Sequence, residues 1–290
     1  MKKQFLLLSI SFVFIVIAII YFSEYNQNVD LVKSSVFINV SYGKDPLQKY
    51  DIFLPENRSS EKTKVIVFIH GGGWTNGDKD NTDKMVLFLR KQHPNHAIVS
   101  TNYRLAKPNS TIKPAFPNQF LDIGFVIDHI ESQKEVYQIL PEFGLIGSSA
   151  GSHLALMYDY VYDTGNRVKM VCSIVGPTDL TDSRYEDNPK FNLYSKTLID
   201  YNKYPENTNH LEAVSPLFQV SPTSSPTILF YGKQDDIVPL SNGKKLSNAL
   251  TSASVNNKFI VFDGGHGDYW SDNFKNQLTE FVKIYLPILK

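Results

Sequence analysis

The chain has 290 residues, of which 42% are hydrophobic and 20% are charged, a composition typical of a folded globular protein rather than a disordered one. Its 29 basic and 29 acidic side chains cancel, and no basic stretch with interleaved aromatic residues occurs, which disfavours a nucleic-acid partner. The single cysteine, Cys172, excludes an internal disulfide, and we expect it to be a small buried apolar side chain. No cluster of metal-ligand residues is visible, so we expect neither a metal ion nor another cofactor.

The N-terminal residues 1–22 are predicted to be a membrane anchor or a signal segment. Two lysines precede an uncharged, largely apolar run at 5–22, which would span about 27 Å as a helix, enough for one bilayer crossing. No small-x-small cleavage site follows, which favours an uncleaved single-pass anchor over a signal peptide whose removal would leave a secreted or periplasmic protein. Glu24 and Asp30 after the run place the rest of the chain outside the cytoplasm. The polar residues 23–34 are interpreted as a linker.

Residues 35–290 are predicted to form one α/β domain, because strand-like and helix-like runs alternate along them. The strands are expected at 36–42, 49–54, 64–70, 97–103, 142–147, 169–175, 227–231 and 258–262, and the helices at 81–92, 118–133, after residue 151, at 240–251 and at 272–286. This alternation predicts a mainly parallel sheet flanked by helices on both faces. The polar stretch 179–225 is too long for a simple connection, so we expect it to contain short helices that form a small cap, with surface decoration as the alternative.

A Gly-Ser-Ser-Ala-Gly sequence at 147–151 follows a predicted buried strand and precedes an amphipathic helix. G-x-S-x-G in that setting is the nucleophile elbow, a turn so tight that the flanking side chains must be nearly absent, and it exposes the middle serine, Ser149. Taken alone, such a stretch is more often an ordinary Gly/Ser turn. The motifs elsewhere in the chain favour the elbow.

Three glycines end the predicted strand 64–70, in the sequence HGGGW at 70–74. Glycines at the carboxyl end of a strand leave backbone N–H groups uncovered and able to approach a ligand. Acyl transfer requires such donors where negative charge develops on the tetrahedral intermediate. A flexible turn is the alternative interpretation.

An acid and a histidine complete the predicted site. Asp235 follows the strand at 227–231 and His266 follows the strand at 258–262, so both emerge where open α/β sheets place their ligand sites. In the expected mechanism His266 deprotonates Ser149 and later protonates the leaving alcohol, while Asp235 orients the imidazole and stabilises its cation.

Other acidic and histidine residues compete for these roles. Asp236 is adjacent to Asp235, and spacing alone does not separate the two. His153 lies on the helix of the elbow, where a packed or hydrogen-bonded histidine is the simpler interpretation, and His70 is expected to order the glycine loop. The remaining histidines lack a glycine-rich loop context and are assigned to the surface or the core: His93, His96, His129 and His210.

Four motifs together resemble the hormone-sensitive-lipase-like branch of the α/β-hydrolases, and more closely bacterial carboxylesterases related to acetyl and feruloyl esterases of plant polysaccharides. They are HGGGW at 70–74, NYRL at 102–105, SAGSHLA at 149–155 and the pattern G-x-x-D-x-x-V-P at 232–239. The resemblance covers roughly residues 35–290 and implies an α/β-hydrolase fold, with nucleophile, acid and base in the order found here.

The same resemblance implies further site residues. The N–H groups of Gly72, Gly73 and Ala150 would be the oxyanion donors. The cap would shape the acyl or alcohol pocket, with Trp74, Tyr103 and Trp270 as lining residues. Two positions depart from the family's usual sequence: Tyr231 stands where histidine is usual, and Ser152 stands where a further glycine is common.

The predicted function is that of a serine carboxylesterase that hydrolyses short-chain acyl esters through an acyl-enzyme. Acetyl or feruloyl groups on saccharides are the expected substrates, and the membrane is the expected second partner. One alternative is an arylformamidase or a peptidase-like hydrolase on the same fold. The other is a non-catalytic surface-binding protein with a hydrolase fold, which has no use for an intact set of Ser149, Asp235 and His266.

Overall fold

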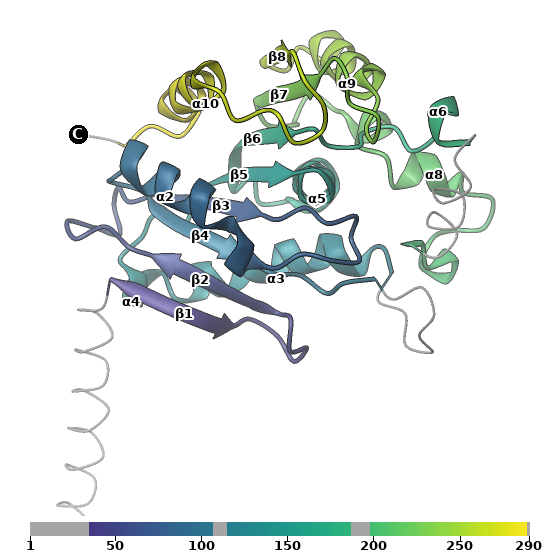
Figure 1. The fold of residues 1–290 in the computed structure, drawn as a ribbon. Coiled ribbons are helices and arrows are strands. Elements are labelled where there is room, and N and C mark those ends of the chain that lie inside the picture. Colours follow the sequence, from purple (N-terminus) through teal and green to yellow (C-terminus); the bar gives the residue numbers. More distant parts are fainter. Residues whose placement is uncertain (1–34, 107–114, 187–197, 289–290) are drawn as a thin grey trace, which may run out of the picture.

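A mainly parallel sheet runs through the computed structural model, which describes residues 35–106, 115–186 and 198–288 (Figure 1). Within these residues the sheet has eight strands, in the spatial order β1-β2-β4-β3-β5-β6-β7-β8. The strands β1 and β2 pair antiparallel, as do β2 and β4, whereas all neighbours from β4 to β8 are parallel. The strand bounds are β1 (Val36–Ser41), β2 (Lys49–Phe53), β3 (Val65–Ile69), β4 (Ala97–Thr101), β5 (Phe143–Ser148), β6 (Val168–Ile174), β7 (Thr227–Gly232) and β8 (Asn257–Phe262). This order confirms the predicted sheet, with the opening strand pair at one edge.

Helices cover both faces of the sheet, as the alternating sequence predicts (Figure 1). One face packs against α3 (Asn118–Ser132), α5 (Ala150–Met157) and α9 (Leu240–Ser252), and the other against α2 (Asp83–Gln92) and α10 (Asp272–Tyr285). The predicted helix at 81–92 begins as a short 3-10 turn, η1 (Lys79–Thr82). Two further short elements continue α3 and α5: α4 (Lys134–Tyr137) and the π-helical turn η2 (Tyr158–Tyr162).

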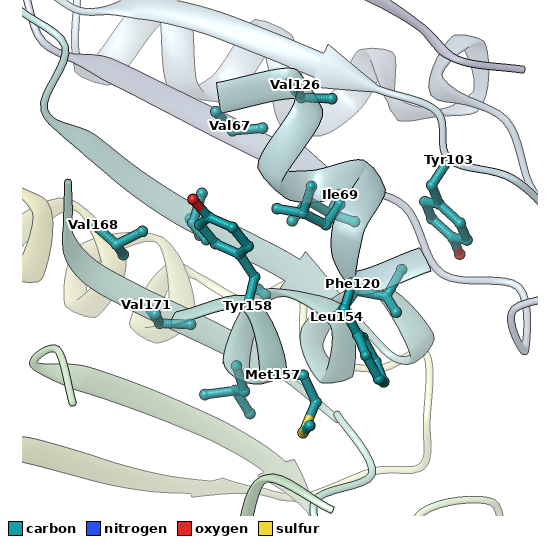
Figure 2. Close-up of a cluster of buried hydrophobic side chains, with 14 of the residues drawn as sticks. Val67, Ile69, Tyr103, Phe120, Val126, Leu154, Met157, Tyr158, Val168 and Val171 are labelled. Carbon is teal, nitrogen blue, oxygen red and sulfur yellow. The ribbon is translucent and has the colours of Figure 1, made fainter. Parts of the chain in front are cut away.

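The central strand β3 is buried along its whole length, because both of its faces are covered by helices. Its alternate side chains enter two separate cores: Val67 and Ile69 belong to the core beneath α3 and α5 shown in Figure 2, and Phe68 belongs to the core beneath α2 and α10. Cys172 of β6 is fully buried in the latter core, which confirms its predicted role as a small apolar side chain.

Short helices occupy the described part of the stretch 179–225, as expected. They are α6 (Ser183–Glu186), η3 (Tyr201–Lys203), α8 (His210–Ala213) and η4 (Pro216–Gln219). The main chain of Leu217 donates to the Thr178 carbonyl at 2.9 Å, and η4 packs against α5 and α9. This end of the stretch is therefore fixed to the carboxyl edge of the sheet. Residues 187–197 of the predicted cap lie outside the described residues.

The predicted anchor or signal segment at 1–22 and the linker at 23–34 also lie outside the part of the chain that the structure describes. Among the described residues, no helix combines the length and the apolar character that a membrane crossing requires.

Candidate active site

Ser149 lies in a sharp turn between β5 and α5. Its φ of 51° and ψ of −119° are costly for a residue other than glycine, as is typical of a nucleophile elbow. A Cβ atom at Gly147 would collide with the backbone of Gly151, and a Cβ atom at Gly151 would collide with the carbonyl of Ile69. The close approach of β3, β5 and α5 therefore explains why both flanking positions are glycine.

The two positions that depart from the usual family sequence make hydrogen bonds to the main chain around this turn. The Ser152 hydroxyl donates to the Gly147 carbonyl at 2.5 Å and accepts from the Ile174 N–H at 2.9 Å, so it ties α5 to the carboxyl ends of β5 and β6. The Tyr231 hydroxyl is fully buried and donates to the Gly176 carbonyl at 2.5 Å. Both residues hold the backbone that supports Ser149.

The predicted nucleophile, base and acid form one hydrogen-bonded line. His266 Nε2 lies 2.9 Å from Ser149 Oγ, and His266 Nδ1 lies 2.8 Å from Asp235 Oδ2. The other carboxylate oxygen of Asp235 accepts from the N–H groups of Ile237 and Val238, each at 2.9 Å. With the Nδ1 proton directed at the carboxylate, Nε2 is free to accept the proton of the serine hydroxyl.

Electrostatics keep Asp235 ionised in this arrangement. Burial by itself would raise the pKa of Asp235, but the hydrogen bonds from His266 and from the Val238 and Ile237 N–H groups outweigh it and hold the pKa below its usual value. Asp236, the competing acid, is exposed, and among the described residues the carboxylate that contacts His266 belongs to Asp235.

The loops that carry Asp235 and His266 are also bound to each other. The Gln234 side-chain oxygen accepts from the Gly264 N–H at 2.5 Å, and the Gln234 N–H donates to the Gly264 carbonyl at 3.0 Å. Asp268 accepts from the Gly265 N–H at 2.8 Å. The sequence analysis missed Gln234 and Asp268, although each lies within two residues of a predicted site residue.

The glycine loop after β3 crosses directly over Ser149. A Cβ atom at Gly71 would lie 3.2 Å from the Ser149 Cβ. Gly72, Gly73 and Trp74 all have positive φ, at 110°, 57° and 62°. Within the described residues, the N–H groups of Gly72, Gly73 and Ala150 have no hydrogen-bond acceptor. These N–H groups are therefore not used by the described part of the fold.

His70 and Tyr103 support the glycine loop from the protein interior. Their rings stack with centroids 4.5 Å apart, His70 Nδ1 donates to the Gly71 carbonyl at 2.7 Å, and the Tyr103 hydroxyl donates to the His70 carbonyl at 3.1 Å. Burial lowers the pKa of His70, so the ring is neutral near pH 7 and orders the loop without exchanging protons.

A buried polar network lies behind the same loop and was not found from the sequence. The Lys79 N–H donates to Asn102 Oδ1 at 2.6 Å, and Asn102 Nδ2 donates to Asp78 at 3.2 Å. The Lys79 ammonium is itself buried and pairs with Asp51 at 2.9 Å. These contacts fix the chain where it leaves the glycine loop for α2.

A pocket of about 380 Å³ opens beside the glycine loop. Trp270 lines it, whereas Tyr103 and Trp74 are buried beneath the loop and are absent from its wall. The pocket reaches the neighbours of the nucleophile and the base rather than Ser149 and His266 themselves. Its wall includes Gly71, Gly72, Asp78, Asn81, Lys84, Ser148, Gly267, Tyr269 and Trp270.

Among the described residues, no group of three or more His, Cys, Asp or Glu side chains is arranged to hold a metal ion.

Comparison with known proteins finds one matching family and several similar esterases. The BD-FAE family model matches residues 50–250, well over half of the chain. Esterase LipC of Mycobacterium tuberculosis is 22% identical over 242 residues, which cover 79% of this chain and 59% of that protein. Arylacetamide deacetylase of Oryctolagus cuniculus is 27% identical over 201 residues, which cover 65% of this chain and 49% of that protein. The chain thus spans about half the length of these curated relatives.

Solved structures show the same fold. A truncated carbohydrate esterase from gut microbiota superimposes with a TM-score of 0.71 at 22% identity, covering 88% of this chain and 97% of that one. Esterase B of Lactobacillus rhamnosis superimposes with a TM-score of 0.69 at 16% identity, covering 91% of each chain.

Proposed function

Because the chain belongs to the BD-FAE family of α/β-hydrolases, we propose that it is a serine carboxylesterase that works through an acyl-enzyme. The observation that carries the proposal is the hydrogen-bonded line from Ser149 through His266 to Asp235. The names of the matched relatives, an esterase and an arylacetamide deacetylase, support the same reaction class.

The proposed reaction has two halves. The Ser149 oxygen attacks the ester carbonyl while its proton moves to His266 Nε2. The bond from the acyl carbon to the alcohol oxygen then breaks, and His266 returns the proton to the departing alcohol. Water, deprotonated by the same imidazole, then attacks the acyl carbon. The bond from that carbon to the Ser149 oxygen breaks, the carboxylic acid leaves, and His266 returns the proton to the Ser149 oxygen. Asp235 stays ionised throughout and stabilises the imidazolium.

The negative charge of each tetrahedral intermediate needs donors that are in place before the reaction. The N–H groups of Gly72 and Gly73 lie on the loop that crosses Ser149, and the N–H of Ala150 is at the first position of α5. The α5 N-terminus adds the favourable end of a helix dipole at the same place. We assign these three N–H groups to the oxyanion site.

Short acyl groups on a larger alcohol, such as a saccharide, are the proposed substrates. The rings of Tyr269 and Trp270 line the pocket beside the site, together with the polar side chains of Asn81 and Lys84, and the Lys84 ammonium lies 4.5 Å from the centre of the Trp270 ring. Flat aromatic and hydrogen-bonding groups suit a polar ring better than a fatty chain. Two proteins of similar fold, a carbohydrate esterase and an acetyl ester-xyloside bifunctional hydrolase, support this substrate class, with acetyl and feruloyl groups as candidates.

The acyl preference can be tested with a p-nitrophenyl ester series from acetyl to decanoyl. We expect kcat/KM to be highest between acetyl and butyryl and to fall for longer chains. A site built for fatty chains would gain about 0.8 kcal/mol, roughly fourfold in kcat/KM, for each buried CH₂ group. The Ser149→Ala protein gives the background rate for each ester. Efficiency that rises out to the decanoyl ester would contradict the short-acyl assignment.

Amide hydrolysis is the second candidate, favoured by the match to arylacetamide deacetylase. An aryl acetate and the corresponding N-aryl acetamide share the acyl group and differ in the leaving atom. A higher kcat/KM for the acetamide would make the amide the preferred substrate.

We further propose that residues 5–22 tether the domain to the outer side of the cytoplasmic membrane. The proposal rests on the length and apolar character of this run and on the lysines before it. We expect the full chain to sediment with membranes and to be released by detergent but not by high salt. A version that begins at residue 24 is the control and should stay in the supernatant. Recovery of the unprocessed full chain in the soluble cytoplasmic fraction would contradict the tether.

A further inference from the structure

His153 lies one helical turn after Ser149 and connects two segments that are far apart in the sequence. Its side chain is completely buried. The Trp74 indole N–H donates to His153 Nδ1 at 3.2 Å, and His153 Nε2 donates to the Val214 carbonyl at 2.7 Å. The glycine loop is thereby joined through α5 to the segment that leads into η4.

The two partners determine which nitrogen of His153 carries the proton. An indole N–H can only donate, so Nδ1 must accept, and a carbonyl can only accept, so Nε2 must carry the proton. An imidazolium would point a second N–H at the Trp74 indole. Burial, partly offset by the hydrogen bond to Val214, lowers the pKa of His153 to about 4, so the ring stays neutral near pH 7. Its aromatic neighbours Phe116 and Phe120 supply no charge.

Trp74 needs such support because its backbone is in an unfavourable conformation. A φ of 62° is rare for a bulky residue and costs on the order of 1 kcal/mol or more. The indole is held edge-on against His153 and Phe116, with ring centroids 5.3 and 5.9 Å away, and the Trp74 carbonyl accepts from the Ala106 N–H at 2.8 Å. Trp74 directly follows Gly73, so a shift of the Trp74 backbone, which the buried indole helps to hold at its positive φ, also moves the peptide group between Gly73 and Trp74.

We propose that His153 is a positioning residue: through the Trp74 indole it holds the N–H groups of Gly72 and Gly73 in the orientation that binds the oxyanion, and through Val214 it couples that orientation to the insertion between β6 and β7. The inference rests on the proposed esterase function. The oxyanion exists only in the intermediates and their transition states, so a misaligned loop lowers kcat and leaves KM nearly unchanged.

Two substitutions separate the two hydrogen bonds of His153. In His153→Asn the amide oxygen lies near the position of Nδ1 and can still accept from Trp74, whereas in His153→Gln the amide nitrogen lies nearer to Nε2 and can still donate to Val214. We expect His153→Gln to lower kcat by about 10- to 100-fold, less than the 10²- to 10³-fold loss of a whole oxyanion donor. We expect His153→Asn to have a kcat much closer to that of the wild type than His153→Gln has. The KM of both variants should stay within about twofold of the wild-type KM.

A second readout reports the oxyanion site directly. Affinity for a trifluoromethyl ketone, whose adduct with the serine mimics the tetrahedral oxyanion, should fall in proportion to kcat/KM in His153→Gln. Affinity for the carboxylic acid product should not change. Trp74→Phe removes the same hydrogen bond from the other side, so it should reproduce the loss, and the double variant should lose little more than either single one. The Trp74 variant also carries the test if His153→Gln does not fold.

His93→Asn is the matched control, because His93 is also a buried histidine but lies at the end of α2, with its pKa lowered by burial to about 4. It should reduce stability to urea while leaving kcat and the ketone affinity unchanged. Wild-type kcat and ketone affinity in both His153→Gln and Trp74→Phe would overturn the positioning role alone. A wild-type protein that hydrolyses no ester and forms no ketone adduct would overturn the esterase function and this inference with it.

Discussion

Replacement of Ser149 by alanine is expected to abolish nearly all hydrolysis of short-chain p-nitrophenyl esters. Without the oxygen that forms the acyl-enzyme, kcat should fall by several orders of magnitude, with a residual rate ~10³–10⁴ above that in water from the oxyanion donors and substrate binding. KM should change little, because Ser149 is one small side chain among the groups that contact the substrate. Stopped-flow release of p-nitrophenol should lose any burst seen in the wild type.

Ser247→Ala is a suitable control for that experiment. Ser247 lies on α9 and its hydroxyl contacts Asn257, so its removal takes away a serine without touching the site. A fluorophosphonate probe should label the wild-type and control proteins by one adduct each and leave Ser149→Ala unlabelled. Near-wild-type hydrolysis by Ser149→Ala would exclude the proposed mechanism.

The adjacent acids Asp235 and Asp236 should differ sharply when each is replaced by asparagine. Asp235→Asn preserves the size of the side chain but no longer favours the Nδ1–H form of His266, and we expect a loss of about 10⁴ in kcat. Asp236→Asn changes an exposed side chain and should lower kcat by less than about threefold, since surface substitutions rarely disturb a site.

Asp236→Asn is the matched control for Asp235→Asn, because the same chemical change is made one residue away. Both kcat and urea unfolding should be measured, so that a loss of folded protein is not counted as a loss of catalysis. The opposite ranking would show that Asp236 is the acid and that the loop rearranges in solution.

The strands, the main helices and the position of the elbow could all be predicted from the amino-acid sequence. These features are local: burial on both faces makes β3 continuously apolar, and the contact between the elbow and its neighbours allows only glycine at 147 and 151. The order of the motifs along the chain was also sufficient to predict that residues 149, 235 and 266 meet at one edge of the sheet, because parallel strands all end there.

The folded loop explains why Asp235, the acid that the resemblance at 232–239 favours, faces His266 whereas the adjacent Asp236 does not. Residues 235 and 236 share a local sequence, but the Val238 and Ile237 N–H groups turn inward and bind the first carboxylate, which leaves the second in solvent. The direction of those N–H groups depends on how the loop folds back toward α9, and residue spacing does not carry that information.

Tertiary packing also determines which way the aromatic side chains near the glycine loop point. The family resemblance implies that Trp74 and Tyr103 line a pocket, yet both side chains turn into the core. The partners that draw them inward are remote, since His153 is 79 residues from Trp74 and 61 from Val214. The orientation of such a buried side chain depends on which hydrogen-bond partner lies within its reach, because an indole or hydroxyl group left unpaired in the interior costs free energy. Such pairings exist only once the strands and helices are assembled, so the sequence predicts where the loop lies and the assembled fold decides which way its side chains point.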